Sequence, residues 1–144
     1  MGASRFPEML RFKNTIVSPE IVTNYLSSQG KYTKQFVTYI YFITDGEFVK
    51  IGIANNPIER LLTLQIGNAR ELKPLFTIPI YKRLSYFRDN YVANDLELFL
   101  HKGFGDNHIR GEWFDILHRI NIDEWRQTFG CEMSHPRYAK KEAV

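Results

Sequence analysis

Residues 37–43 constrain the fold of this chain more than any other segment. All of them are β-branched or aromatic, a composition typical of a buried strand and unfavourable for a helix. Asp45-Gly46 then supplies a turn, and residues 48–53 have the pattern of a second strand. Two strands joined by an Asp-Gly turn predict a β-hairpin. We therefore expect a core built on a buried hairpin.

Capping residues predict a helix on each side of this hairpin. Ser18 stands before Pro19, an arrangement that begins a helix running to about residue 28. Asn56 stands before Pro57 in the same way and opens a second helix, which Gly67 ends.

The second helix is expected to be amphipathic. Ile58, Leu61 and Leu62 share a face, which we expect to pack inward. Arg60 does not share that face, so it is free to point at a ligand near the end of the hairpin.

Two more elements follow the second helix. Residues 72–81 predict a third strand, and Pro74 and Pro79 favour an edge position because proline has no N–H to donate. Residues 85–101 predict the longest helix. Residues 111–114 are expected to form a turn followed by a short extended piece.

A last helix is capped by Asn121 and ends at Gly130. The predicted fold is α+β, with a small, three-stranded, mainly antiparallel sheet flanked by helices. We divide the chain into an N-terminal helical extension at 1–35, a main domain at 36–130 and a basic C-terminal tail at 131–144.

Charge and cysteine content narrow the functional classes. Residues 31–90 carry nine Lys/Arg and five Asp/Glu, whereas residues 91–144 carry seven and nine. This bias fits either a basic surface that faces a polyanion or ordinary surface variation. The single cysteine, Cys131, excludes an internal disulfide and suits a reducing compartment. With no long apolar stretch, we expect a soluble, cytoplasmic protein that does not enter a membrane.

Five side chains form a set suited to phosphodiester chemistry: Tyr41, Lys50, Arg60, Glu97 and His101. The hairpin brings the tyrosine and the lysine side by side, and Glu97 and His101 share a helix face. Hydrolysis of a phosphodiester needs an activated water and positive charge on the phosphate. A guanidinium suits the phosphate, and a carboxylate suits a hard cation such as Mg²⁺.

Each of these residues also has a plain structural interpretation. Tyr41 could be a core aromatic, and Lys50 a solvated strand residue. Arg60 could pair with a surface acid. Glu97 and His101 could form a helical i,i+4 surface pair. The order of the residues along the chain favours the functional interpretation.

That order resembles the GIY-YIG endonuclease superfamily. Tyr-Ile-Tyr at 39–41 and Lys-Ile-Gly at 50–52 look like its two name-giving motifs, and Arg60 matches its helix arginine. Glu-Leu-Phe-Leu-His at 97–101 and Gly-Glu-Trp-Phe at 111–114 look like signatures of the T5orf172/MUG113-type branch. The resemblance covers roughly residues 36–120 and implies a nuclease fold.

The resemblance implies a role for each matched residue. Tyr41 would be a base or water-positioning group, and Lys50 stands where many members have a second tyrosine. Arg60 would bind the scissile phosphate. Glu97 would be the only protein ligand of a Mg²⁺ or Mn²⁺ ion, and His101 would orient Glu97 or approach the phosphate.

The chain departs from the family pattern in two places. Tyr39 replaces the first motif glycine, and Lys50 replaces the tyrosine, so the group that activates water stays open. Lys50 could serve as a base only if burial or Arg60 lowered its pKa. Glu112 is expected to hold the loop of Trp113.

The implied partner is DNA, with RNA not excluded. We expect nucleic-acid contacts from Tyr39, Arg60, Arg70 and Lys73, although residues 68–70 could also be a plain loop. The leading hypothesis is a metal-dependent endonuclease, for which a separate domain or a partner protein could supply the targeting. The alternatives are an inactive nucleic-acid-binding module of the same fold and a protein-interaction domain.

Overall fold

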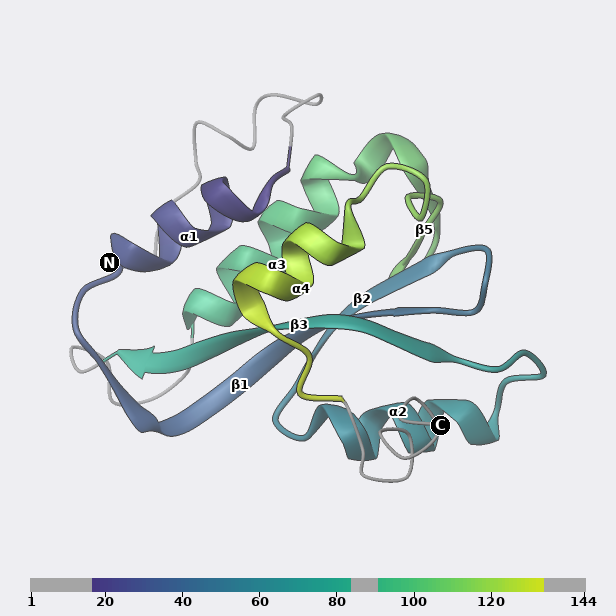
Figure 1. Cartoon of the computed structure of the whole chain (residues 1–144), viewed down its shortest axis with the longest axis horizontal. Coiled ribbons are helices and arrows are strands. Elements are labelled where there is room, and N and C mark those ends of the chain that lie inside the picture. The colour runs from purple at the N-terminus through teal and green to yellow at the C-terminus, as the bar shows by residue number, and fades with distance from the viewer. Residues whose placement is uncertain (1–16, 84–90, 134–144) are drawn as a thin grey trace.

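The computed structural model describes residues 17–83 and 91–133 (Figure 1). Three parts of the predictions lie outside these ranges. They are the first 16 residues of the N-terminal segment, the start of the helix predicted from residue 85, and residues 134–144 of the basic tail. Among the described helices, none is long and apolar enough to cross a membrane.

An antiparallel sheet runs through the molecule, with the strand order β3-β1-β2-β5-β4. Its strands are β1 (Tyr32–Thr44), β2 (Val49–Ala54), β3 (Lys73–Arg83), β4 (His108–Arg110) and β5 (Trp113–Phe114). The α+β class and the edge position of β3 are as predicted. The prediction of three strands is wrong, because β4 and β5 extend the sheet beyond β2.

The β1–β2 hairpin forms as its sequence predicts. Tyr41 lies opposite Gly52, and Thr44 lies opposite Val49. In the turn, the Asp45 carboxylate accepts hydrogen bonds from two backbone N–H groups, and Gly46 adopts a φ of +100°. That φ favours glycine, so the Asp-Gly pair sets the register of the hairpin.

Four α-helices accompany the sheet: α1 (Pro19–Ser27), α2 (Pro57–Ile66), α3 (Tyr91–Gly103) and α4 (Ile122–Phe129). Within the described residues, a 3₁₀ turn, η2, spans Gly105–Asn107. The predicted caps are present, since the side chains of Ser18, Asn56 and Asn121 each accept a hydrogen bond from a backbone N–H in the first helical turn.

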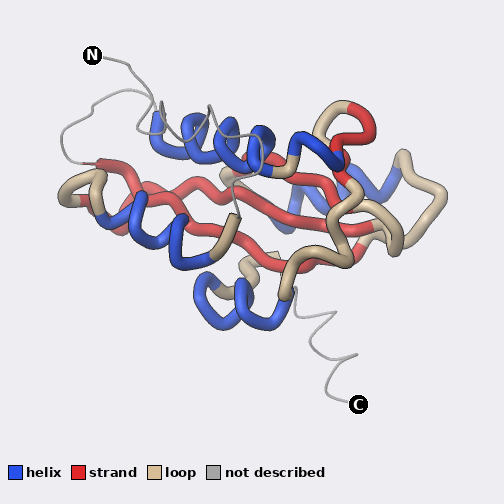
Figure 2. Tube along the Cα trace, turned by 90° about the horizontal axis from the view of Figure 1, so that it is seen from above, coloured by secondary structure: helices blue, strands red, loops and turns tan. Residues whose placement is uncertain are grey.

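The helices cover the two faces of the sheet unequally. Helices α1, α3 and α4 lie on one face, and α2 lies on the other (Figures 1 and 2). The first face holds the larger core, which includes Phe42, Phe76 and Trp125. The second face holds a smaller cluster, in which Tyr41 and Leu61 pack with their neighbours.

The inward face of α2 differs from the predicted one. Pro57 and Leu61 are buried, Ile58 is partly buried, and Leu62 is exposed. Leu64 instead packs against the smaller core. The helix is therefore rotated slightly from the expected orientation, while Arg60 still lies on its exposed side.

Strand β1 is longer than predicted, because it begins at Tyr32 rather than at 37. Its pairing with β3 shifts register between Thr33 and Val37. The segment from Tyr32 onward therefore joins the sheet, and α1 packs on the same core through Val22 and Tyr25.

The chain after α4 crosses the outer edge of β3. The carbonyl of Gly130 accepts a hydrogen bond from the Thr77 N–H at 3.1 Å, and the Glu132 N–H donates to the Thr77 hydroxyl at 2.8 Å. Met133 is then fully buried in the smaller core with Tyr41. The C-terminal segment thus supports the face of the sheet that carries α2.

Candidate functional site

The candidate site forms at the outer edge of β2. Strand β5 pairs with β2 only at Val49 and Lys50. One residue further on, the Ile51 N–H donates to the Glu112 carbonyl at 3.0 Å, and His101 Nε2 lies 3.1 Å from the Ile51 carbonyl. Helix α3 and the β4–β5 turn therefore meet at this edge.

The contact with Ile51 determines how His101 can act. A carbonyl oxygen only accepts hydrogen bonds, so Nε2 carries the hydrogen and donates it. In the neutral ring, Nδ1 then keeps its lone pair for a metal ion or a water molecule. His101 also packs edge-on against Phe114, with ring centroids 5.0 Å apart. These two contacts hold the imidazole in one orientation.

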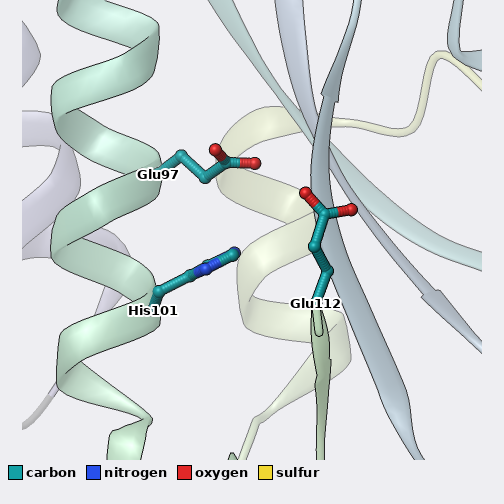
Figure 3. A group of neighbouring side chains, drawn as sticks. All are labelled: Glu97, His101 and Glu112. Atoms are coloured by element: carbon teal, nitrogen blue, oxygen red, sulfur yellow. The ribbon is translucent and has the colours of Figure 1, made fainter. Parts of the chain in front are cut away.

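Glu97, His101 and Glu112 offer ligand atoms that all lie within 4.8 Å of one another (Figure 3). Glu97 and His101 are one turn apart on α3, and Glu112 comes from the turn before β5. Burial, together with the charge of Glu112 and a hydrogen bond between the two carboxyl groups, raises the pKa of Glu97 to about 7. Lys50 opposes this rise. The pair is therefore suited to share a proton or to hold a cation.

Lys50 points along the same face toward Glu112. Its Nζ lies 3.1 Å from Glu112 Oε1 and 5.6 Å from the centroid of the Trp113 ring. Its side chain is only 15% exposed. An ammonium ion in this ion pair is held as a hydrogen-bond donor and a positive charge beside the carboxyl pair.

Tyr41 lies in the middle of the smaller core with its hydroxyl directed at the same region. The residue is 1% exposed, and its buried hydroxyl has no hydrogen-bond partner among the described residues. Burial raises its pKa, and the charges of Glu112 and Glu97 add to the rise. The charge of Arg60 and its hydrogen-bonding interaction with the phenol lower that pKa, although the contact falls short of regular hydrogen-bond geometry.

Gly52 is required for this position of Tyr41. A Cβ atom on Gly52 would overlap the phenol ring and hydroxyl of Tyr41, because the ring lies over the glycine on the neighbouring strand. The Lys-Ile-Gly motif therefore needs glycine at its third position for a steric reason.

Arg60 lies at the exposed side of the site. It lines an open pocket of about 310 Å³ with Ala54, Asn56 and Thr63, next to the capped start of α2. Its influence on the pKa of Tyr41 places the guanidinium beside the phenol. A phosphate bound there would meet the guanidinium and the tyrosine together.

The other predicted nucleic-acid contacts are arranged differently. Tyr39 lies on the same sheet face as Tyr41, because side chains alternate between the two faces along β1 and these residues are two positions apart. Arg70 pairs with Asp45 and Glu47 across the hairpin turn, at 3.5 and 3.0 Å. Those two carboxylates neutralise it, so we do not assign it a phosphate. Lys73 is exposed at the start of β3.

The structure thus brings Tyr41, Lys50, Arg60, Glu97 and His101 to one region. It adds Glu112, which sequence reasoning treated only as a loop residue. Its acidic side chain directly before the Trp-Phe pair was the available signal, but only the β2–β5 pairing brings it to Lys50 and Glu97.

Comparison of the chain with protein-family models, with curated proteins and with solved structures finds no match.

Proposed function

We propose that this protein is a metal-dependent phosphodiesterase that cuts nucleic acid, with DNA as its substrate. The observation that carries the proposal is the meeting of the Glu97–His101–Glu112 group with the partnerless Tyr41 hydroxyl at one strand edge. A buried hydroxyl without a partner costs stability, so an external ligand is its natural partner.

The donor set fits a hard divalent cation. Two carboxylates lie so close that one of them holds a proton near neutral pH, and a cation would relieve that repulsion. Oxygen ligands suit Mg²⁺ and Mn²⁺, and an imidazole nitrogen favours Mn²⁺ of the two. Glu97 and Glu112 would hold the ion, with His101 Nδ1 as a third ligand. A bound ion would supply Lewis-acid stabilisation of the phosphate and of the leaving oxygen.

The remaining side chains act on the phosphate and the attacking water. Arg60 binds the phosphate through its planar fork. Tyr41 is protonated, because burial raises its pKa, so it donates a hydrogen bond rather than removing a proton. Lys50 is ion-paired with Glu112 and stabilises negative charge on the phosphorus oxygens. Tyr41 and Lys50 therefore position the phosphate and stabilise its negative charge, and neither removes a proton from water.

Nicking of supercoiled plasmid DNA tests this proposal. The protein is incubated with Mg²⁺, with Mn²⁺ or with EDTA, and the open-circle product is followed with time. Cutting should need the metal and should fall roughly 100-fold or more in Arg60→Ala and in Glu97→Gln. The charge-matched controls Lys31→Ala and Glu71→Gln change exposed residues outside the site and should cut normally.

Equal cutting by Arg60→Ala, Glu97→Gln and the parent would refute the assigned site. A second candidate function is a nucleic-acid-binding module, favoured by the Lys50–Glu112 ion pair, which engages one of the two carboxylates of the proposed metal group. That candidate predicts salt-dependent DNA binding, lost in Arg60→Ala, with no cutting of plasmid, single-stranded DNA or RNA.

A further inference from the structure

A second concave site lies next to the Glu97–His101–Glu112 group and shares His101 with it. Its volume is about 550 Å³, within the range of small-molecule sites. It lies between the C-terminal half of α3, the turn η2 and strands β4 and β5. Its lining includes Leu98, His101, Lys102, Asp106, His108 and Phe114.

His101 belongs both to this pocket and to the Glu97–His101–Glu112 group. A ligand whose phosphate is bound by Arg60 and by a metal ion at the Glu97–His101–Glu112 group would therefore reach the pocket across one imidazole ring. In a nucleic-acid strand, the parts that extend from a phosphate on this scale are the neighbouring sugar and base.

The lining has the chemistry of a base-binding pocket rather than of a phosphate site. Leu98 is 44% exposed and offers an apolar wall, and Phe114 forms the buried floor. Lys102 and Asp106 place one positive and one negative charge in the lining. The attraction of an anion by Lys102 is therefore offset by its repulsion from Asp106. Flat apolar surface with a few polar groups is what recognises an extruded base.

His108 is held ready to contact such a ligand. Its Nε2 donates to the Gly111 carbonyl at 2.7 Å, and its ring packs on Phe114 with centroids 5.2 Å apart. The Nε2 contact leaves Nδ1 as an acceptor in the neutral ring. Two imidazoles, from His101 and His108, therefore flank the aromatic floor.

We propose that this pocket binds the nucleobase of the nucleotide next to the phosphate that is cut. The position of the base next to a cleaved phosphate rests on the proposed nuclease function, but base binding in the pocket can be measured without any cleavage. It implies a substrate in which that base is unpaired or easily extruded, such as single-stranded or distorted DNA.

A nuclear magnetic resonance titration of the full chain with deoxyadenosine 5′-monophosphate tests the pocket. Chemical shifts of Gly105, Asp106 and the Leu98 methyl groups should move with the nucleotide. They should move far less with 2-deoxyribose 5-phosphate, which has the phosphate but no base. Leu98→Trp fills the pocket from its exposed wall and should raise the dissociation constant at least 10-fold.

Ile66→Trp is the matched control, because Ile66 is 88% exposed on α2 and does not line the pocket. It should bind the nucleotide like the parent. Shifts confined to the Arg60 pocket, or equal shifts with the base-free phosphate, would overturn the base-binding assignment.

The same variants separate this proposal from the nuclease proposal. If the parent cuts DNA but Leu98→Trp neither weakens nucleotide binding nor raises KM for single-stranded DNA, the pocket assignment alone is wrong. If the nucleotide moves the pocket signals in a protein that never cuts, base binding stands and the nuclease proposal fails.

Discussion

At the scale of single residues, the Tyr41 hydroxyl has no benefit for folding. It is buried within the smaller core without a regular hydrogen bond to any of the described residues, although Arg60 lies beside it and lowers its pKa. A polar group in this state destabilises the folded protein by roughly 1–3 kcal/mol. Residues that cost stability in this way are commonly retained for function.

Tyr41→Phe is therefore expected to stabilise the protein while abolishing cutting. The substitution keeps the ring over Gly52 and removes only the partnerless hydroxyl. The free energy of unfolding should rise by roughly 1 kcal/mol, measured by urea denaturation. Tyr25→Phe is the opposite control, since the Tyr25 hydroxyl donates to Asp95 at 3.1 Å, and its loss should destabilise. A destabilised Tyr41→Phe protein would contradict this account.

Glu97 should make the metal-free protein less stable as the pH rises. Burial and the neighbouring Glu112 raise its folded pKa to about 7 from an ordinary value of 4.5. Between these values the folded state binds more protons than the unfolded state, so the free energy of unfolding falls with increasing pH. For a half-buried carboxyl screened by solvent, the loss is about 1–2 kcal/mol between pH 4.5 and 7.5.

Thermal or urea unfolding in EDTA measures this effect in the parent and in Glu97→Gln. The glutamine variant should lack the part of the pH dependence that Glu97 contributes. Mn²⁺ should raise the unfolding midpoint of the parent more at pH 8 than at pH 5.5, because metal binding displaces the proton. Identical pH profiles for the two proteins would show that Glu97 is not the group that titrates.

Several site residues were predictable from the sequence because regular structure has a regular period. Tyr41 and Lys50 share a face through alternation in a hairpin, and Glu97 and His101 share a face through the helical repeat. Glu112 was not predictable in the same way. Its place depends on β5 pairing with the first two residues of β2, which no local pattern encodes.

At the scale of elements, local signals predicted the helices and the hairpin well. Proline and capping side chains set the starts of α1 and α2, and the Asp-Gly turn set the hairpin. Strand β4 was missed because its three residues are all exposed and pair only with β5, so they show no apolar pattern. The rotation of α2 was missed because Leu62 and Leu64 are equally apolar in sequence.

The cap of α2 should matter to the site in a way that the cap of α4 does not. The Asn56 side chain accepts from the Glu59 N–H at 3.1 Å, and Asn121 accepts from the Glu124 N–H at the same distance. Alanine at either position should cost about 1 kcal/mol of stability. Only Asn56→Ala should also weaken DNA binding, since α2 carries Arg60 one turn later.

Equilibrium unfolding and a fluorescence-anisotropy titration with labelled DNA make this comparison. Equal stability losses with a several-fold weaker affinity only in Asn56→Ala would support the role of α2 as the carrier of the phosphate site. Equal affinities of the two variants for DNA would instead show that the cap of α2 does not affect substrate binding.

At the scale of the whole molecule, the smaller core joins distant parts of the chain. Tyr41 comes from β1, Leu61 from α2, Leu72 from the segment before β3, and Met133 from the C-terminal segment. The position of the site tyrosine therefore depends on a residue far along the sequence. This dependence was not visible in the sequence, because Met133 lies in the segment predicted to be a basic C-terminal tail.

Met133→Ala is expected to destabilise the protein by about 2–4 kcal/mol and to reduce cutting beyond what the stability loss explains. The side chain is fully buried, so its truncation leaves a cavity beside Tyr41. Cys131→Ala, at a partly exposed position of the same segment, should cost far less. Urea unfolding, with nicking rates measured where both variants are folded, tests this expectation.

The crossing of the C-terminal segment over β3 also covers part of an edge to which a strand of another chain could otherwise pair. Along that border Thr77 is already occupied by Gly130, Arg126 covers the carbonyls of Pro74 and Leu75, and Pro79 has no hydrogen to offer. A foreign strand would find few free groups there on which to add itself. The terminal segment therefore disfavours aggregation through the β3 edge of the sheet.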